Sequence, residues 1–142
     1  MTVQLSTQQQ QLLKDCFDVV MDMHANTQYK NYKVDEKDIL QMIANHIVGG
    51  FVHLKEGCLL IGKTYTPWFG GCKFASDVLL YTKKESRGKG LAKEAVKEFM
   101  RWSESNGAVS ITIGQSTGVN EKEFNGLAEG LGMKRIGAVY NV

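Results

Sequence analysis

A short segment rich in glycine and basic residues has the composition of an anion-binding site. Residues 87–90, RGKG, follow an apolar run that ends at Thr82 and come directly before an amphipathic segment that starts at Leu91. A strand that turns through glycines into a helix presents free backbone N–H groups at the positive end of the helix dipole, where a phosphate binds. Because Gly88 and Gly90 carry no Cβ, an anion can approach their backbone closely. The sequence therefore predicts a phosphate-binding loop.

Three nucleotide-binding motifs have glycines in such a setting. A Walker P-loop requires GxxxxGK[ST], and this segment is too short and lacks the Lys-Ser/Thr pair. A Rossmann fingerprint requires GxGxxG, and Lys93 stands in place of its third glycine. The third pattern, Arg-x-x-Gly-x-Gly/Ala, is satisfied by RGKGLA at 87–92. The alternative is a loop whose glycines serve only the turn and whose lysines serve only solubility.

Residues 80–92, LYTKKESRGKGLA, resemble the acetyl-CoA signature of the GNAT superfamily of N-acetyltransferases. The expected order of elements along nearly the whole chain is similar to that family: a short strand, two helices, three strands, the signature helix, a strand, a helix and a last strand. Residues 131–133, Leu-Gly-Met, also stand where the family commonly has Leu-Gly-Phe at the end of its last helix. The resemblance implies a GNAT fold with acetyl-CoA as co-substrate and no metal.

The resemblance also implies where acetyl-CoA binds. In the family, backbone N–H groups of the signature hold the CoA pyrophosphate, and the preceding strand separates from its neighbour so that the pantetheine arm pairs with exposed main chain. Carried over to this chain, the pyrophosphate site comprises Arg87, Gly88, Lys89, Gly90, Leu91 and Ala92, and the pantetheine site comprises Leu80, Tyr81 and Thr82. A main-chain N–H near Tyr81 or Thr82 would polarise the thioester carbonyl, as an oxyanion hole does.

The catalytic acid departs from the family pattern. Members often carry a tyrosine four residues before the glycine of the Leu-Gly-Phe element, where it protonates the leaving thiolate. In this chain Ala128 occupies that position. Tyr140 and Ser116 are the candidates to replace the missing tyrosine if the fold brings them close.

Asp77 is the candidate for the general base that takes a proton from the amine. Many family members place a carboxylate on or beside the central strand, and Asp77 is the only acidic residue between Glu56 and Glu85. Period-two alternation puts Asp77 on the same face as Leu79 and Tyr81, so a bulge or a loop is needed to turn it toward the substrate. The alternative is a solvent-exposed aspartate in a turn.

The segments that must position these residues switch between helical and strand periodicity. We expect an α/β fold in a single domain over residues 1–142: a mixed, mostly antiparallel central sheet with helices on both faces, GNAT-like, with a short C-terminal end. Ser6 and Asp35 are suited to cap the first two helices. The expected strands are 3–5, 51–54, 58–61, 77–82, 110–113 and 135–142, and the expected helices are 7–23, 36–49, 91–106 and 121–131. The run 77–82 is nearly continuous in apolar residues, which predicts burial on both faces.

An aromatic segment separates two of the expected strands. Residues 64–71 contain Tyr65, Trp68 and Phe69 together with a proline and a glycine pair, which is typical of a loop. These rings either line a substrate or form local core, because aromatic side chains dominate both kinds of contact.

The composition limits the partners and the compartment. The 142 residues include 17 Lys+Arg and 15 Asp+Glu, for a net charge of +2, so a dedicated binder of nucleic acid or of anionic membranes is not expected. Three cysteines without CxxC spacing and three scattered histidines predict reduced thiols, a cytoplasmic protein and no metal site. No apolar run is long enough to span a membrane, and the first residues lack the pattern of a secretion signal.

The leading prediction is an acetyl-CoA-dependent N-acetyltransferase that transfers an acetyl group to a primary amine by direct attack. The acceptor is expected to be a small-molecule amine or a protein or peptide amine, and a second copy of the chain is a candidate partner in a homodimer. The alternative is a non-catalytic GNAT-fold module that binds CoA or another protein, because fold does not fix function. A third reading takes residues 83–90 as RNA or DNA phosphate contacts, which conflicts with the low net charge.

Overall fold

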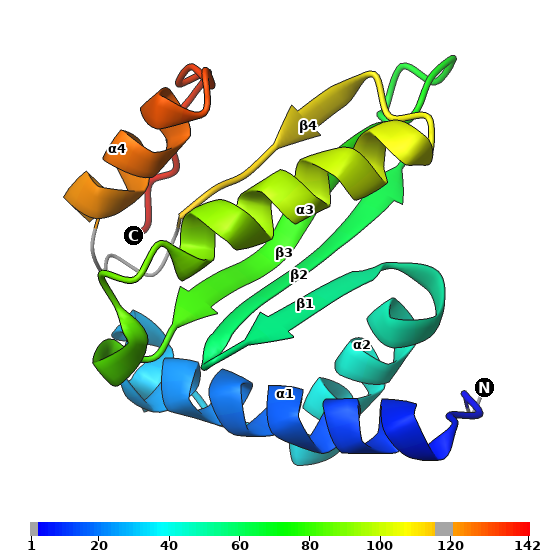
Figure 1. Ribbon diagram of the computed structural model, residues 1–142, viewed down its shortest axis with the longest axis vertical. Helices are drawn as coiled ribbons and strands as arrows, with labels where there is room; N and C mark the ends of the chain where they lie inside the picture. The colour runs from blue at the N-terminus through cyan, green and yellow to red at the C-terminus, as the bar shows by residue number, and fades with distance from the viewer. Residues whose placement is uncertain (1–2, 116–120) are drawn as a thin grey trace.

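The computed structural model describes residues 3–115 and 121–142 (Figure 1). Two helices come first, three strands follow, and the later elements alternate between helix and strand. The helices are α1 (Thr7–Ala25), α2 (Glu36–Gly49), α3 (Leu91–Ser105) and α4 (Glu121–Gly130), with the 3-10 helices η1 (Gln28–Asn31) and η2 (Lys84–Ser86). The strands are β1 (Phe51–Lys55), β2 (Cys58–Tyr65), β3 (Phe74–Thr82) and β4 (Ser110–Thr112).

The four strands form one sheet in the order β1-β2-β3-β4. β1, β2 and β3 pair antiparallel, whereas β4 runs parallel to β3. The parallel pair is joined through α3, because strands that run in the same direction need a crossover connection. The expectation of a mixed, mostly antiparallel sheet is confirmed.

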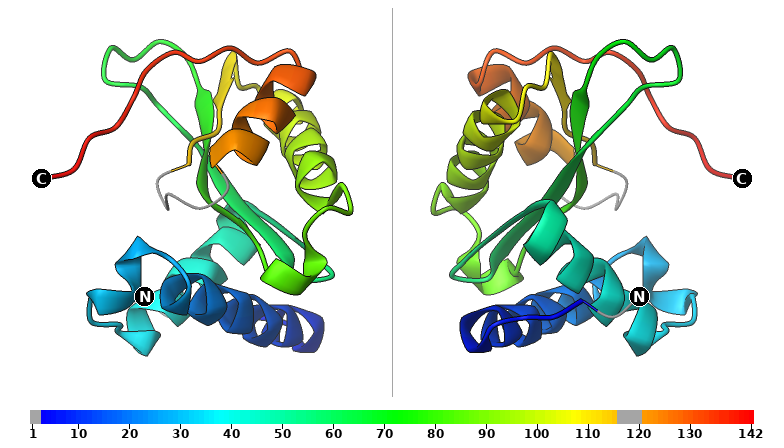
Figure 2. Two further views of the ribbon diagram at one scale, coloured as in Figure 1. Left: turned by 90° about the vertical axis from the view of Figure 1, so that its left-hand side faces the viewer. Right: turned by 90° about the vertical axis from the view of Figure 1, so that its right-hand side faces the viewer.

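Helices cover both faces of the sheet, as the sequence predicted (Figure 2). On one face, α1 and α2 pack against a buried cluster that includes Ile43 together with Leu59 and Ile61 of β2. On the other face, α3 packs through Phe99 against a second cluster that includes Leu60 of β2, and α4 adds partly buried side chains to it. Because alternate residues of β2 enter opposite clusters, this one strand ties the two layers together.

The first two helices begin where the sequence predicts. The hydroxyl of Ser6 accepts a hydrogen bond from the backbone N–H of Gln9, whose side chain accepts one from Ser6 N–H, which forms a capping box. The Asp35 carboxylate accepts a hydrogen bond from Asp38 N–H and caps α2. These local contacts fix the start of each helix independently of the rest of the fold.

The most buried strand is β2, so the prediction that residues 77–82 are buried on both faces is wrong. Residues 58–61 of β2 are fully buried, whereas burial varies along β3 and Val78 is 40% exposed. The reason is position: β2 lies between two strands and under both helix layers, while β4 borders only residues 74–76 of β3. β2 also continues to Tyr65 and β3 begins at Phe74, so both strands are longer than predicted and the connection between them is 66–73 instead of 64–71.

The two terminal strands that the sequence predicts are absent from the structure. Residues 3–5 and 135–142 form no strand. In the second segment the apolar side chains of Ile136, Val139 and Tyr140 are 77%, 87% and 92% exposed. Apolar alternation favours a strand only when a neighbouring strand supplies the hydrogen bonds, and these residues run away from the sheet (Figure 2).

Candidate functional site

β3 and β4 separate after a short stretch of pairing, and this fork is the centre of the candidate site. Only residues 74–76 of β3 pair with β4, and within the described part of the chain β2 is the sole partner strand of residues 77–82, of which all but Val78 are paired. The carboxylate of Asp77 marks the fork, since its Oδ1 accepts a 3.0 Å hydrogen bond from the backbone N–H of Gly114. The edge of β3 beyond the fork therefore offers backbone groups to an extended ligand.

A cavity of about 410 Å³ lies beside this edge of β3. It is bounded by β3, by the loop that leads to α3, by the first turn of α3 and by α4. Its lining residues are Leu80, Tyr81, Thr82, Ser86, Arg87, Gly88, Gly90, Leu91, Ala92, Lys93, Gln115, Glu123, Phe124 and Leu127. Every residue that the sequence assigned to acetyl-CoA lines this cavity except Lys89. The structure thus brings the two halves of the predicted cofactor site together.

The loop before α3 has a backbone that requires glycine. Gly88 and Gly90 have φ angles of 83° and 74°, which favour glycine, and Gly90 is the N-cap of α3. A Cβ added at either residue would meet nothing within 4 Å. The positive φ angles account for the glycines, and the open space beside them lets a phosphate at the start of α3 approach the backbone N–H groups. These residues therefore fit the pyrophosphate of CoA.

Arg87 joins this loop to the end of β3. Its Nε donates a 2.9 Å hydrogen bond to the carbonyl of Thr82, and its guanidinium carbon lies 5.6 Å from the ring centroid of Tyr81. A cation over an aromatic ring is attracted by the ring's quadrupole, so the stacking and the hydrogen bond hold the side chain in one place. Arg87 thus fixes the loop relative to β3 and keeps positive charge at the cavity.

The hydroxyl of Tyr81 is engaged on the opposite face of the sheet. It donates a 2.9 Å hydrogen bond to the Asp22 carboxylate of α1. Burial, reinforced by Asp22, raises the pKa of Tyr81 to about 12, so the phenol is neutral at physiological pH. Tyr81 therefore connects α1 to β3, and its hydroxyl is not available as a proton donor at the fork.

A β-bulge at Val78 changes the face on which Asp77 lies. Gly62 of β2 lies opposite Asp77, and the β2 residue before Gly62 lies opposite Leu79, so Val78 is the extra residue. Gly62 faces α3, because a Cβ placed on it would lie 2.3 Å from the Phe99 ring. Asp77 therefore lies on the α3 side of the sheet and not on the side of Leu79 that strict alternation predicted.

Asp77 has an unusual protonation equilibrium. Burial raises its pKa to about 6, although the hydrogen bond from Gly114 N–H acts in the opposite direction. A carboxylate with this pKa is ionised at pH 7 and is more basic than an ordinary aspartate. Asp77 lies at the fork and is half-buried, but it is not among the residues that line the cavity.

The structure does not bring the predicted acid Tyr140 to the cavity. Its side chain is 92% exposed on the C-terminal segment, far along a stretch without secondary structure. Ser116, the other candidate, lies outside the described residues. The position that a catalytic tyrosine commonly occupies in the family holds Ala128 on α4.

Sequence reasoning missed the part of the cavity wall that comes from outside the signature. Gln115 follows β4, and Glu123, Phe124 and Leu127 belong to α4. Phe124 and Leu127 are three residues apart on one face of α4, and that helical spacing is the signal that could have assigned them to a cavity wall. Glu123 carries no comparable signal, because one acidic residue in the first turn of a helix is common.

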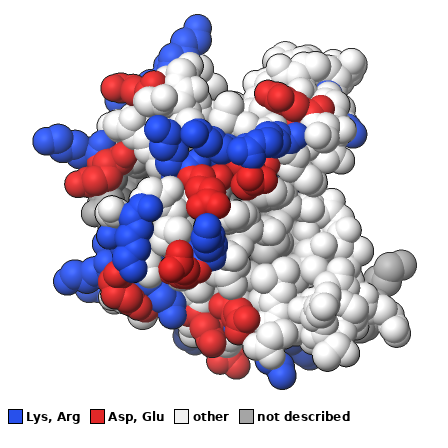
Figure 3. Space-filling model, viewed as in Figure 1, with Lys and Arg blue, Asp and Glu red and all other residues white. Residues whose placement is uncertain are grey.

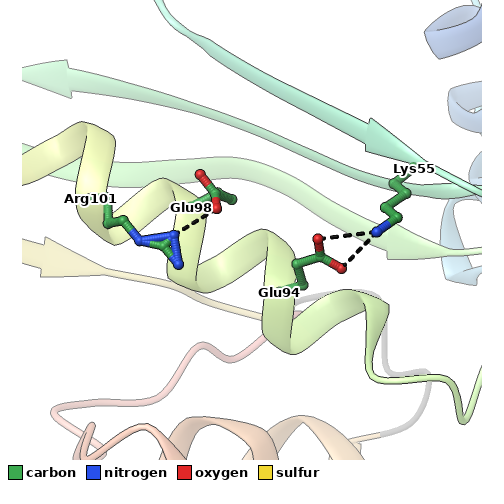
Figure 4. A network of polar contacts seen from close by, with 4 residues as sticks. All are labelled: Lys55, Glu94, Glu98 and Arg101. Atoms are coloured by element: carbon green, nitrogen blue, oxygen red, sulfur yellow. Dashed lines mark hydrogen bonds and ion pairs between the residues drawn. The ribbon is translucent and has the colours of Figure 1, made fainter.

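Ion pairs on the surface steady the helix that carries the loop (Figure 4). Lys55 Nζ of β1 lies 3.2 Å from both carboxylate oxygens of Glu94 in the first turn of α3, and Arg101 lies 2.6 Å from Glu98 within α3. Both pairs are about half exposed, so each contributes at most about 1 kcal/mol. Acidic and basic side chains are interspersed on the face shown in Figure 3.

Two further properties concern metals and membranes. Among residues 3–115 and 121–142, no group of three or more His, Cys, Asp or Glu side chains is arranged to hold a metal ion. In the same ranges, none of the helices has the length and hydropathy needed to cross a bilayer.

Comparisons with known proteins place the fold. No family model matches the sequence, and no curated protein matches it. Among solved structures, an aminoglycoside acetyltransferase from an uncultured soil metagenomic sample is similar over 100% of this chain and 98% of its own, with a TM-score of 0.64 and 14% identity. A ribosomal-protein-alanine N-acetyltransferase from Brucella melitensis biovar Abortus 2308 is similar over 92% and 94%, with a TM-score of 0.62 and 14% identity.

A third similar structure contains a ligand related to CoA. AAC(6')-Iy in complex with the bisubstrate analogue CoA-S-monomethyl-acetylneamine matches over 91% of both chains, with a TM-score of 0.64 and 13% identity. At this level of identity the likeness establishes architecture, not activity. The chain has the GNAT fold. The fork between the parallel strands, the glycine loop and the order of the helices agree with that fold.

Proposed function

We propose that the protein is an acetyl-CoA-dependent N-acetyltransferase that transfers the acetyl group to a primary amine by direct attack. The observation that carries the proposal is the cavity at the fork, where the edge of β3 and the N-terminus of α3 meet. The first can pair with an extended amide-containing chain, and the second can hold an anion. Pantetheine and pyrophosphate are joined in this order in CoA.

Backbone groups do most of the binding in this proposal. The N–H groups at 87–92 hold the pyrophosphate, with Arg87 and Lys89 adding positive charge, and residues 80–82 pair with the pantetheine arm. The apolar side chains of Leu80, Phe124 and Leu127 line the same cavity and limit the access of water to it. A main-chain N–H at the exposed edge of β3 stabilises negative charge on the carbonyl oxygen, as in an oxyanion hole.

The reaction needs little from side chains. The amine nitrogen attacks the thioester carbonyl carbon, a C–N bond forms, the C–S bond breaks, and the electron pair leaves with sulfur. One proton leaves the amine and one reaches the thiolate, so the products are an N-acetyl amide and free CoA thiol. Asp77 is the proposed base, supported by its pKa of about 6 and its place at the fork. The side chain of Tyr140 is 92% exposed and does not line the cavity, so a bound water is the proposed donor of the proton to the thiolate.

The alternative function is a CoA-binding module without catalysis. Ala128 at the usual tyrosine position and the exposed side chain of Tyr140 favour it. The two functions share CoA binding and differ in turnover, so measuring both separates them.

The test uses two glycines that flank α3. Gly90 precedes the helix and Gly107 follows it, both have positive φ angles, and neither has an atom within 4 Å of an added Cβ. Gly90→Glu places a carboxylate and a side chain where the phosphate should lie, so CoA affinity measured by calorimetry should fall by about 100-fold or more. Gly107→Glu introduces the same change at the other end and should leave the affinity unchanged.

Acetyl transfer is then followed as release of free thiol with a panel of amines. Turnover by the unaltered protein supports the enzyme, and CoA binding without turnover on any amine supports the module. Equal CoA affinity in Gly90→Glu and Gly107→Glu would remove the proposed pyrophosphate site.

A further inference from the structure

One half of the sheet carries side chains that neither core cluster includes. β2, β3 and β4 place six residues in two rows on the face opposite α3, which we call the open face: Lys63, Tyr65, Phe74, Ser76, Ser110 and Thr112. Lys63, Ser76 and Thr112 form the row nearer the fork, and Tyr65, Phe74 and Ser110 form the farther row. Ala75 and Ile111, between them in sequence, belong to the α3 cluster, which fixes the direction of the others.

The open face is the side from which an acceptor can reach the fork. α1 and α2 pack under residues near the other end of the sheet, including Leu59 and Tyr81, whereas α3 and α4 lie on the opposite face (Figure 2). Val78, at the bulge where the fork opens, is 40% exposed, and Tyr65 is 38% exposed. A ligand on the open face would therefore meet Val78 without displacing any described helix.

Aromatic rings continue the open face onto the β2–β3 loop. The rings of Tyr65 and Phe74 lie 6.1 Å apart, those of Phe74 and Phe69 lie 5.7 Å apart, and those of Phe69 and Trp68 lie 5.4 Å apart. Trp68 is 95% exposed and Phe69 is 56% exposed. A connected group of exposed rings is uncommon on a monomer and marks a binding surface for an apolar or aromatic group.

The charge of the two rows of the open face favours an anionic group over a cationic one. Lys63 is exposed in the row nearer the fork, and no residue of the two rows is acidic. A ligand with several ammonium groups would meet a like charge here and find no carboxylate to pair with. A ligand with a carboxylate about 7 Å from its reactive amine would instead pair with Lys63, because alternate strand residues recur at about 7 Å.

We propose that the acceptor is the amino terminus of an extended peptide that carries an acidic side chain at its third residue and an aromatic one at its fifth. This inference rests on the proposed function. The amine lies at the gap between β3 and β4 beside Val78, and its proton passes through a bound water to Asp77, which lies on the α3 side of the sheet. From there the near row lies about 7 Å away and the far row about 13 Å away, and an extended peptide repeats its side chains at the same spacing. The acid contacts Lys63, and the aromatic ring packs on Phe74 and Tyr65. The transfer is the reaction given under the proposed function, with the α-amino nitrogen of the first peptide residue as the nucleophile.

The experiment compares four acceptors at saturating acetyl-CoA. They are the peptide amides Ser-Gly-Glu-Gly-Phe, Ser-Gly-Lys-Gly-Phe and Ser-Gly-Glu-Gly-Ala, and the aminoglycoside sisomicin. We expect kcat/KM for the first peptide to exceed that of the lysine peptide by about threefold or more and that of the alanine peptide by a similar factor. Sisomicin should be the poorest acceptor per amine.

Variants of the open face separate its two contacts. Lys63→Glu should reverse the preference between the glutamate and lysine peptides, mainly through KM, while Lys97→Glu on the exposed side of α3 should leave it unchanged. Phe69→Ala should reduce the preference for phenylalanine over alanine at the fifth position. Circular dichroism of each variant checks that the fold is kept.

Peptide binding is also measured directly, by ligand-observed NMR without acetyl-CoA, so the two proposals fail separately. If the protein binds CoA and transfers acetyl groups but prefers sisomicin to the peptides, the peptide inference is overturned and the acetyltransferase is retained. The same holds if Lys63→Glu does not alter the preference between the glutamate and lysine peptides. Selective peptide binding without CoA binding would overturn the acetyltransferase and retain the open face as a peptide site. If the protein neither binds CoA nor binds the peptides selectively, both proposals are overturned.

Discussion

The two sides of the fork differ in how they can recognise a ligand. On the cavity side, backbone groups of β3 and of the α3 N-terminus face a space enclosed by α3 and α4, and glycines keep it clear. On the open face, side chains provide the contacts: a lysine, hydroxyl groups and aromatic rings. Backbone recognition depends on the fold and tolerates changes in side chains, whereas side-chain recognition changes with single substitutions. A constant co-substrate suits the first side, and a variable acceptor suits the second.

The largest expected effect is a loss of turnover without a loss of CoA affinity when Asp77 at the fork is replaced. Asp77→Asn should lower turnover by about 100-fold or more, because an amide cannot take the proton from the amine, and CoA affinity should stay within about twofold. For the unaltered protein, the rate should fall as the pH drops below about 6, since protonation of Asp77 removes the base. Steady-state rates from pH 5 to pH 9 together with calorimetry test this. A full rate in Asp77→Asn at every pH would assign proton removal to water.

The next effect concerns the packing that supports the cavity side. Gly62→Ala should destabilise the fold by about 1–3 kcal/mol, because its Cβ would lie 2.3 Å from the Phe99 ring and force α3 outward. Gly49→Ala is the control change at the exposed last residue of α2, where an added Cβ meets nothing within 4 Å, and it should be neutral or slightly stabilising. Urea unfolding of both variants measures the difference. Equal effects would show that Gly62 is not a packing contact of α3.

The smallest effect is a change in stability with pH. Because the folded pKa of Asp77 is about 6 and the ordinary value is 3.8, the native state binds more protons than the unfolded state between these pH values. Stability from this group is therefore lost as the pH rises through that window. Asp77→Asn should raise the melting temperature relative to the unaltered protein at pH 7.5 by a few degrees, and the gain should shrink at pH 4.5. A gain that is larger at pH 4.5 would contradict the raised pKa.

The sequence predicted the parts of the molecule that local segments determine. The caps at Ser6 and Asp35 and the glycine loop at 87–92 depend on residues a few positions apart, so their types and spacing were sufficient. The predicted strand at 135–142 was wrong because a strand depends on a partner that the pattern cannot supply.

The remaining parts depend on contacts between distant segments. The bulge at Val78 appears only in the pairing of β3 with β2, and it decides the face of Asp77. The open face arises from register across three strands, and no single segment carries its pattern. Glu123 reaches the cavity through the placement of α4, which the helical period does not specify.

Hydrogen exchange at the fork tests the central claim most directly. The account states that CoA pairs with the edge of β3 and with the loop before α3, so adding CoA should slow amide exchange at residues 80–82 and 87–92 by about tenfold or more. Exchange in α1 and α2, which lie on the other face, should not change. Measured by mass spectrometry with and without CoA, protection confined to those two segments is the predicted result. Unchanged exchange there, or protection that appears only elsewhere in the chain, would contradict a CoA site at the fork.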